Sequence, residues 1–308
     1  DRWHAEIGGR YDFKYLDIAG YRYRRDATNE DGTVEQYLLT DTREFHNASG
    51  TAGILYHFSS KLSWKSNIGL AWRAPSVNEL YSDGVHHGSA TYELGKPDLR
   101  SEKGLKWINS FIWSGEGLQA TVDVYAQMLY DYIYAQPNPD TVRQTIRGTF
   151  PLFAYQQHDA FFYGTDLRMR YALREDMHYD MNASFVRARN VDLGDYLPYI
   201  PPARVQHAFS WMYTGETVQG NYIKLAHRFV ARQTQYREGM DYAAPPSAYH
   251  LFDMVVNKQF KTDTDTSWQV MLSVENIFNR SYKDYMDRFR YFAHQMGRNA
   301  NLKISYQF

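Results

Sequence analysis

The sequence contains no cysteine, no long apolar run and no excess of charge of either sign, and each absence removes a class of protein. Without cysteine among its 308 residues, it can form neither a disulfide framework nor a thiolate metal site. Its 34 Lys and Arg residues balance 35 Asp and Glu residues, which argues against a nucleic-acid partner. No apolar run approaches the ~20 residues that a transmembrane helix needs. The first residues, 1–4, also lack the apolar core of a signal peptide, so we expect a cytoplasmic protein or a mature or partial chain.

Aromatic side chains are abundant instead. The chain has 27 Tyr, 17 Phe and 7 Trp, which together make up 17% of its residues. Such rings suit a membrane interface, because the ring lies in the apolar layer while the polar tip of Tyr or Trp stays in water. The composition therefore indicates a protein surface that meets a membrane.

Apolar side chains recur with a period of two along most of the chain. In the last segment Leu302, Ile304, Tyr306 and Phe308 alternate with polar residues. The same alternation is found in residues 64–73, 118–127 and 268–275. A period of two predicts β-strands that have one apolar face and one polar face.

The connections between these strands are of two kinds. The short and polar connections are 59–61, 114–117, 174–176, 214–216 and 261–267. The long connections are roughly 24–35, 75–97, 136–151, 191–203, 235–247 and 279–295. Short turns at one end and long loops at the other are typical of transmembrane β-barrels. We therefore predict an all-β fold, an antiparallel up-and-down transmembrane β-barrel with about twelve strands in this chain.

A soluble all-β protein, such as a sandwich or a propeller, is the alternative fold. Its strands should be about 5–6 residues long, without a systematic difference between the loops at the two ends. Here many strands exceed ten residues and aromatic residues gather at strand ends, which favours the barrel. Alternation has already begun at Trp3, Ala5 and Ile7, so we expect the C-terminal part of a larger barrel.

Three stretches resemble TonB-dependent outer-membrane receptors. Residues 274–282 and 295–299, together with the terminal Phe308, resemble the C-terminal signature of that family. Residues 72–81 resemble its Arg-Ala-Pro-Ser segment, and residues 92–102 resemble the strand start that follows it.

The resemblance implies that residues 1–308 are the C-terminal portion of a 22-stranded barrel in the bacterial outer membrane. The plug domain and the TonB box of the family have no counterpart in this chain. The implied function is active import of a metal or metal complex that is captured at the extracellular loops. The implied partners are outer-membrane lipid, the TonB complex through the plug, and a small metal-containing ligand.

A narrower resemblance concerns the ZnuD-like branch, which takes up zinc. Residues 84–93 look like the histidine-bearing loop of that branch, Glu93 aligns with a ligand carboxylate, and His250 aligns with a ligand histidine. Zinc without thiolates prefers imidazole nitrogen and carboxylate oxygen. We therefore predict that His86, His87, Glu93 and His250 bind transported Zn²⁺ over the mouth of the lumen, with plug residues completing the shell. Solvated rim histidines are the plain alternative.

Other cargoes and sites stay open. His158 and His294 are candidates for a second, weaker metal site. Haem, a siderophore chelate or cobalamin is the alternative cargo. A siderophore would favour contacts with Tyr81, Tyr236 and Arg237, whereas haem would need an axial ligand such as His86 or His87. A passive porin of about twelve strands is the alternative from a different class.

Enzymatic activity is not predicted, and no resident cofactor is expected. The sequence has no nucleophile elbow, phosphate-binding glycine loop or His-Glu-x-x-His motif. The best available set for nucleophilic catalysis is Ser247, His250 and Asp253. The alternation also predicts a group of charged residues that face inward and keep the lumen polar. These residues are Lys65, Asp123, Asp166, Arg168, Arg170 and Lys303.

Overall fold

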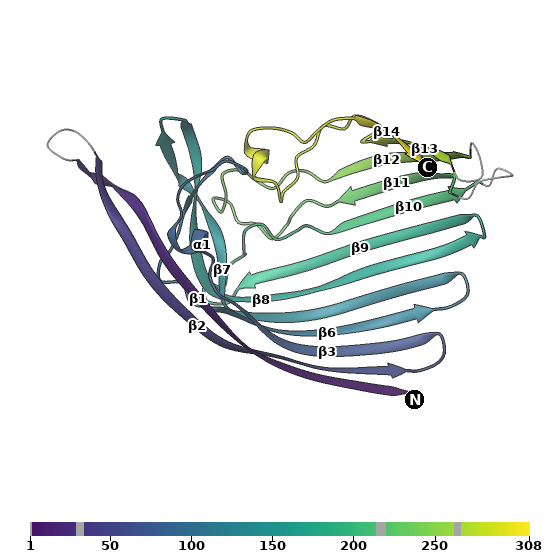
Figure 1. Cartoon of the computed structure of the whole chain (residues 1–308), viewed down its shortest axis with the longest axis horizontal. Helices are drawn as coiled ribbons and strands as arrows, with labels where there is room; N and C mark the ends of the chain where they lie inside the picture. The colour runs from purple at the N-terminus through teal and green to yellow at the C-terminus, as the bar shows by residue number, and fades with distance from the viewer. Residues whose placement is uncertain (1, 29–33, 214–219, 262–265) are drawn as a thin grey trace.

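Twelve long strands lie side by side in chain order and form one curved antiparallel wall (Figure 1). The computed structural model describes residues 2–28, 34–213, 220–261 and 266–308. The strands of the wall are β1 (Trp3–Thr28), β2 (Val34–His57), β3 (Leu62–Arg73), β6 (Glu102–Ser114), β7 (Leu118–Thr145), β8 (Gly148–Arg174), β9 (Met177–Asn190), β10 (Arg204–Met212), β11 (Tyr222–Val230), β12 (Tyr249–Lys261), β13 (Ser267–Glu275) and β14 (Asn299–Gln307). Within the described residues β1 and β14 each pair with a single neighbour. The wall is therefore an open, partial barrel, and the predicted fold and strand number are confirmed.

The remaining elements belong to two long connections. Between β3 and β6 lie a short helix, α1 (Val77–Tyr81), and a hairpin of β4 (Asp83–His86) with β5 (Thr91–Leu94). Strand β5 also pairs in parallel with β8. The 3-10 helix η1 (Arg288–Tyr291) lies between β13 and β14. Among the residues that the structure describes, no helix is long and apolar enough to cross a membrane.

The predicted asymmetry of the connections is present. The turns between β2 and β3, between β6 and β7 and between β8 and β9 are short and lie at the right in Figure 1, whereas the long connections lie at the opposite end. Residues 214–216 and 262–265, which belong to two predicted short turns, lie outside the described residues.

One predicted long loop, residues 136–151, is instead a hairpin that extends the wall. Strands β7 and β8 continue beyond their first contacts, and Val142 to Thr145 pair with Gly148 to Pro151. Gly148 has a backbone φ angle of +125°, a value that residues other than glycine rarely adopt. Prolines in this stretch argue against a strand when only the sequence is considered. The structure accommodates them at a register shift between Pro137 and Val142.

The outer face of the wall is apolar. Ile7, Leu302 and Ile304 expose 89%, 64% and 58% of their surface, and the register places Leu302 beside Leu272 and Ile304 beside Val270 on the same face. A continuous apolar surface of this extent is unfavourable in water. It is the outward-facing band of a transmembrane barrel.

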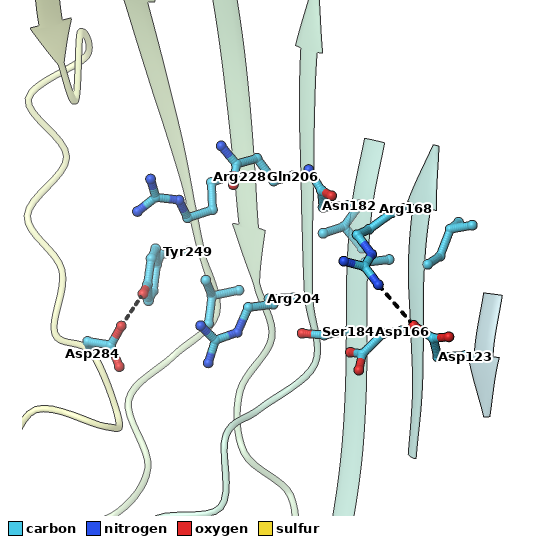
Figure 2. Close-up of a pocket in the computed structure, with 14 residues that line it drawn as sticks. Asp123, Asp166, Arg168, Asn182, Ser184, Arg204, Gln206, Arg228, Tyr249 and Asp284 are labelled. Atoms are coloured by element: carbon cyan, nitrogen blue, oxygen red, sulfur yellow. Dashed lines mark hydrogen bonds and ion pairs between the residues drawn. The ribbon is translucent and has the colours of Figure 1, made fainter. Parts of the chain in front are cut away.

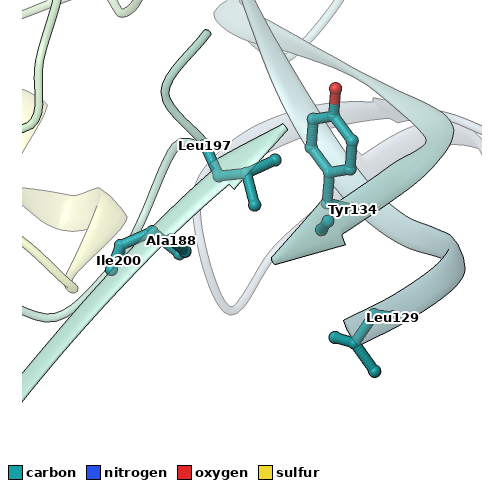
Figure 3. Packing of buried hydrophobic residues seen from close by; sticks show 6 residues of the cluster. Leu129, Tyr134, Ala188, Leu197 and Ile200 are labelled. Atoms are coloured by element: carbon teal, nitrogen blue, oxygen red, sulfur yellow. The ribbon is translucent and has the colours of Figure 1, made fainter. Parts of the chain in front are cut away.

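Long loops cover part of the inner face. The β9–β10 connection folds back so that Leu197 and Ile200 pack against Leu129, Ala160 and Ala188 of the wall (Figure 3). This buried cluster fixes the loop to the inner side. The rest of the inner wall has a polar surface.

Candidate ligand-binding surface on the inner wall and its loops

The β3–β6 connection is held in a defined shape by local hydrogen bonds. Ser76 Oγ accepts a hydrogen bond from the amide of Glu79 at 3.3 Å, and the Glu79 carboxylate accepts one from the amide of Ser76 at 2.7 Å, so the capping box at the N-terminus of α1 is complete. A Cβ at Gly95 would lie 2.6 Å from the backbone of Leu80. Glycine at this position therefore lets the end of β5 lie directly against α1.

The hairpin brings Glu93 into contact with a distant loop. Glu93 is 6% exposed. Its Oε1 accepts a hydrogen bond from Arg288 Nη1 at 2.9 Å, and its Oε2 accepts one from Tyr155 Oη at 3.1 Å. The Arg288 guanidinium also lies over the ring of Phe153, 4.3 Å from its centroid. This ion pair connects the β3–β6 loop with the β13–β14 loop.

A second ion pair connects the β11–β12 loop with the β13–β14 loop. Arg290 is 2% exposed and pairs with Asp241. It also donates to the backbone oxygens of Ala243 and Ala244 at 3.2 Å. Tyr291 donates to the same carboxylate. A buried charge needs such partners, because transfer out of water is otherwise strongly unfavourable.

Several loop groups have shifted pKa values; burial, for example, raises the pKa of Asp241. Burial, with neighbouring Tyr199 and Asp241 as further causes, raises the pKa of the Tyr291 hydroxyl, so this group is a hydrogen-bond donor at neutral pH. The hydrogen bond from Arg237 lowers the pKa of Asp195, and the two groups lie 2.7 Å apart. Near neutrality the Tyr291 hydroxyl is thus protonated and the Asp195 carboxylate is charged.

The inner wall below these loops carries charges of both signs around a hollow of about 530 Å³ (Figure 2). Arg168 Nη2 donates to Asp123 Oδ2 at 3.2 Å, and Tyr249 donates to Asp284 at 2.9 Å. Arg204 lines the same hollow. This charged surface agrees with the predicted polar lumen, and it can hold a charged ligand without forming a covalent bond to it.

The two predicted histidine ligands of the β4–β5 hairpin are exposed and adjacent. His86 Nδ1 lies 3.0 Å from Ser89 Oγ, and His87 Nε2 lies 3.0 Å from Arg147 Nη1. Glu93 is in the same hairpin but is buried against Arg288. Among the described residues, no three His, Asp or Glu side chains are grouped so that they could hold a metal ion. The structure therefore does not bring the predicted ligands together.

His250 lies on the other side of the wall. In β12 it shares a face with Phe252, Met254 and Val256, because side chains alternate along a strand. That face is the apolar outer one. His250 Nδ1 lies 3.0 Å from His227 Nε2 on the neighbouring strand.

The other candidates are also placed. His158 Nδ1 lies 3.1 Å from Tyr134 Oη, and His294 is exposed in the β13–β14 loop. The Tyr81 hydroxyl donates a hydrogen bond to the Asp41 carboxylate, and Arg237 forms an ion pair with Asp195.

The proposed nucleophilic set of Ser247, His250 and Asp253 is not assembled. Asp253 lies three residues after His250 in β12, so the two side chains project from opposite faces. Asp253 accepts the amide of Asn276 at 2.8 Å instead.

Sequence reasoning missed Arg288, Arg290, Asp241 and Tyr291. The only signal was the unusual density of Arg and aromatic residues in 285–292. Their partners lie far away in the sequence, 195 residues for Arg288 with Glu93 and 49 for Arg290 with Asp241.

The solved structures that are similar to this chain include a copper transporter, an iron transporter and an import receptor. The chain is similar to the copper transporter OprC, with 18% identity, a TM-score of 0.76, and coverage of 100% of this chain and 46% of that one. It is similar to the FrpB iron transporter from Neisseria meningitidis (F3-3 variant), with 15% identity, a TM-score of 0.67 and coverage of 100% and 43%. It is also similar to the ferric-catecholate import receptor Fiu from K12 E. coli, with 14% identity, a TM-score of 0.68 and coverage of 99% and 42%. The chain thus spans a little under half the length of each.

A family comparison covers most of the chain. The family described as "TonB dependent receptor-like, beta-barrel" matches residues 1–277. Its members are β-barrel proteins of the bacterial outer membrane, as the apolar outer face requires. The chain therefore belongs to the TonB-dependent receptor family and forms part of its β-barrel.

Proposed function

We propose that this chain contributes the wall and the capturing loops of an outer-membrane receptor that imports a metal or a metal complex, with energy supplied through TonB. The observation that carries the proposal is the loop surface in which Glu93 and Arg288 meet above a charged inner wall. The names of the similar structures, a copper transporter, an iron transporter and a ferric-catecholate receptor, support a metal-containing cargo.

Zinc is the cargo that we favour. The support is the pair of adjacent, exposed imidazoles of His86 and His87, in a loop that resembles the histidine loop of the ZnuD-like branch. Two imidazoles from neighbouring residues hold zinc only with further ligands. Glu93 lies in the same hairpin and is the predicted carboxylate ligand, and it would exchange Arg288 for the metal. His250 on the outer face is not part of this proposal.

An anionic metal chelate is the second candidate. It is favoured by Arg288, whose guanidinium lies 4.3 Å from the ring centroid of Phe153 and 5.3 Å from that of Tyr199, and by Arg204 in the hollow of the inner wall. Guanidinium groups bind oxyanions in bidentate fashion. Haem and cobalamin are further outcomes of the same experiment.

The test is calorimetric titration of zinc chloride, haemin, a ferric catecholate and cobalamin, each into a separate sample of the whole receptor in detergent. We expect saturable zinc binding that weakens at least tenfold, about 1.4 kcal/mol, in a His86→Gln/His87→Gln variant. His57→Gln is the matched control, because His57 lies at the short-turn end and contacts Ser63. Unchanged affinity in the double variant would remove the zinc proposal, and binding of haemin alone would change the cargo. Failure of zinc, haemin, the ferric catecholate and cobalamin to bind would contradict a metal-uptake receptor.

A further inference from the structure

Three histidine rings and a tyrosine ring form a row on the outer face of β9 to β12. Tyr179 is hydrogen-bonded to His207 Nδ1. His207 stands directly opposite His227, with ring centroids 5.7 Å apart and ring planes within 3°. The rings of His227 and His250 follow at 5.2 Å and 11°. We call Tyr179, His207, His227 and His250 the ring row.

The ring row occupies the apolar side of the wall. His227 shares its face with Leu225 and Phe229, and His250 shares its face with Phe252. Leu225 and Phe252 are exposed. Polar rings at this surface are unexpected, because barrels place apolar residues on the lipid side.

The three histidines lie near the long-loop ends of their strands. His207 is three residues after the start of β10, His227 is three residues before the end of β11, and His250 is the second residue of β12. His250 is exposed. His250 is therefore next to the β11–β12 loop, where water and dissolved ions reach a barrel surface, whereas His207 pairs with Met181 nearer the short-turn end of β9.

The geometry points to a transition-metal site between His227 and His250. His227 Nε2 and His250 Nδ1 are 3.0 Å apart. Two imidazole nitrogens bound side by side to one ion at about 2.0–2.1 Å are roughly 3 Å from each other. An ion can therefore replace the hydrogen that the two nitrogens share, once both rings tilt toward it. The displaced hydrogen moves to the other nitrogen of its own ring, so both imidazoles stay neutral.

The ligand class follows from the donors. We propose that His227 and His250 bind a divalent transition-metal ion on the outer face, with water completing the coordination shell. Imidazole suits copper, nickel and zinc, and copper(II) binds most tightly in this series. Water molecules would supply the remaining ligands, because the pair provides only two protein donors.

Phenylalanine rings on the same two strands pack against His227 and His250. His250 packs against Phe229, with centroids 4.7 Å apart, and His227 packs against Phe252, with centroids 4.6 Å apart. These contacts keep the two imidazoles next to each other on the outer face. His207 next to His227 is a positioning residue, because it is held in turn by Tyr179.

The test is titration of copper(II) chloride into the purified protein in detergent, followed by electron paramagnetic resonance. In the His86→Gln/His87→Gln background, which removes the proposed cargo site, we expect one bound ion with hyperfine structure from two nitrogens. The variants His227→Gln and His250→Gln should each weaken this binding at least tenfold. His46→Gln is the matched control. His46 also faces outward, in β2, but it is hydrogen-bonded to Tyr11 and not to another imidazole. Its affinity should equal that of the wild type.

Two further measurements distinguish this site from the His86/His87 site and test it in the unsubstituted protein. The His86→Gln/His87→Gln variant should retain the two-nitrogen signal, which separates this site from the proposed cargo site. In the wild type, copper(II) should protect His227 and His250, but not His46, from modification by diethyl pyrocarbonate, a result that does not depend on how variants fold. A signal without nitrogen structure, unchanged affinity in both variants, or no protection would show that the ring row only satisfies its own hydrogen bonds.

Discussion

The buried pair of Arg290 and Asp241 gives the sharpest prediction about the loops. The variant Asp241→Asn keeps the size of the side chain and removes its charge. Arg290, at 2% exposure, then keeps its charge without a counter-ion. The two loops that this pair connects should open more often.

The size of the effect follows from the burial of the guanidinium. Breaking a buried ion pair by changing one partner costs about 3–5 kcal/mol. The backbone oxygens of Ala243 and Ala244 still accept hydrogen bonds from Arg290, so we expect the lower end, about 3 kcal/mol. That free energy corresponds to a more than hundredfold increase in loop opening, because each 1.4 kcal/mol is a factor of about ten.

Hydrogen exchange followed by mass spectrometry measures this opening in peptides from residues 231–248 and 276–298. The control is Asp195→Asn, because Asp195 and Arg237 form an exposed pair, and such pairs are worth about 0–1 kcal/mol. The double variant Asp241→Asn/Arg290→Met removes the uncompensated charge and should recover most of the protection. If Asp241→Asn exchanges no faster than the control, the reasoning about the buried pair is refuted.

Two other predictions concern pH and the faces of the wall. The pKa of Asp195 is lowered by Arg237, so this contact stabilises the folded loop above the ordinary Asp pKa of about 4 and weakens as the pH falls through the lowered value. Exchange in residues 191–203, corrected for its intrinsic pH dependence, should therefore rise below pH 4 in the wild type but not in Arg237→Gln; equal behaviour of the two would contradict the assignment. Spin labels at Leu302 and Ile304 should report lipid and a label at Lys303 should not, and equal lipid contact at all three would contradict the assignment of the outer face.

Strand positions could be predicted because lipid imposes a strict pattern. In β14, Leu302 and Ile304 must face outward while Lys303 faces inward, so the period of two is visible without any knowledge of neighbouring strands. The pattern fails where it is interrupted. Because of the prolines and the register shift after Pro137, the alternation did not predict the end of the β7–β8 hairpin that lies farthest along these two strands.

The same alternation contained information about His250. Counting along β12 places it with Phe252 and Met254 on the apolar face, so the sequence could have separated it from the loop histidines. Its contact with His227 could not be read in this way, because it depends on the pairing of β11 with β12. Contacts such as Glu93 with Arg288 were equally hidden, since loops far apart in the sequence meet only in the folded chain.

The central claim is that the receptor containing this chain takes up a metal cargo with energy from TonB. The most direct test is accumulation of radioactive zinc, and of ferric and cupric chelates, by metal-limited cells that carry or lack the receptor gene, with and without an active TonB complex. The account predicts that one metal cargo accumulates only when both the receptor and TonB are present, and that zinc does so if His86 and His87 capture it. Accumulation that is the same without the receptor, or that continues without TonB, would contradict the account.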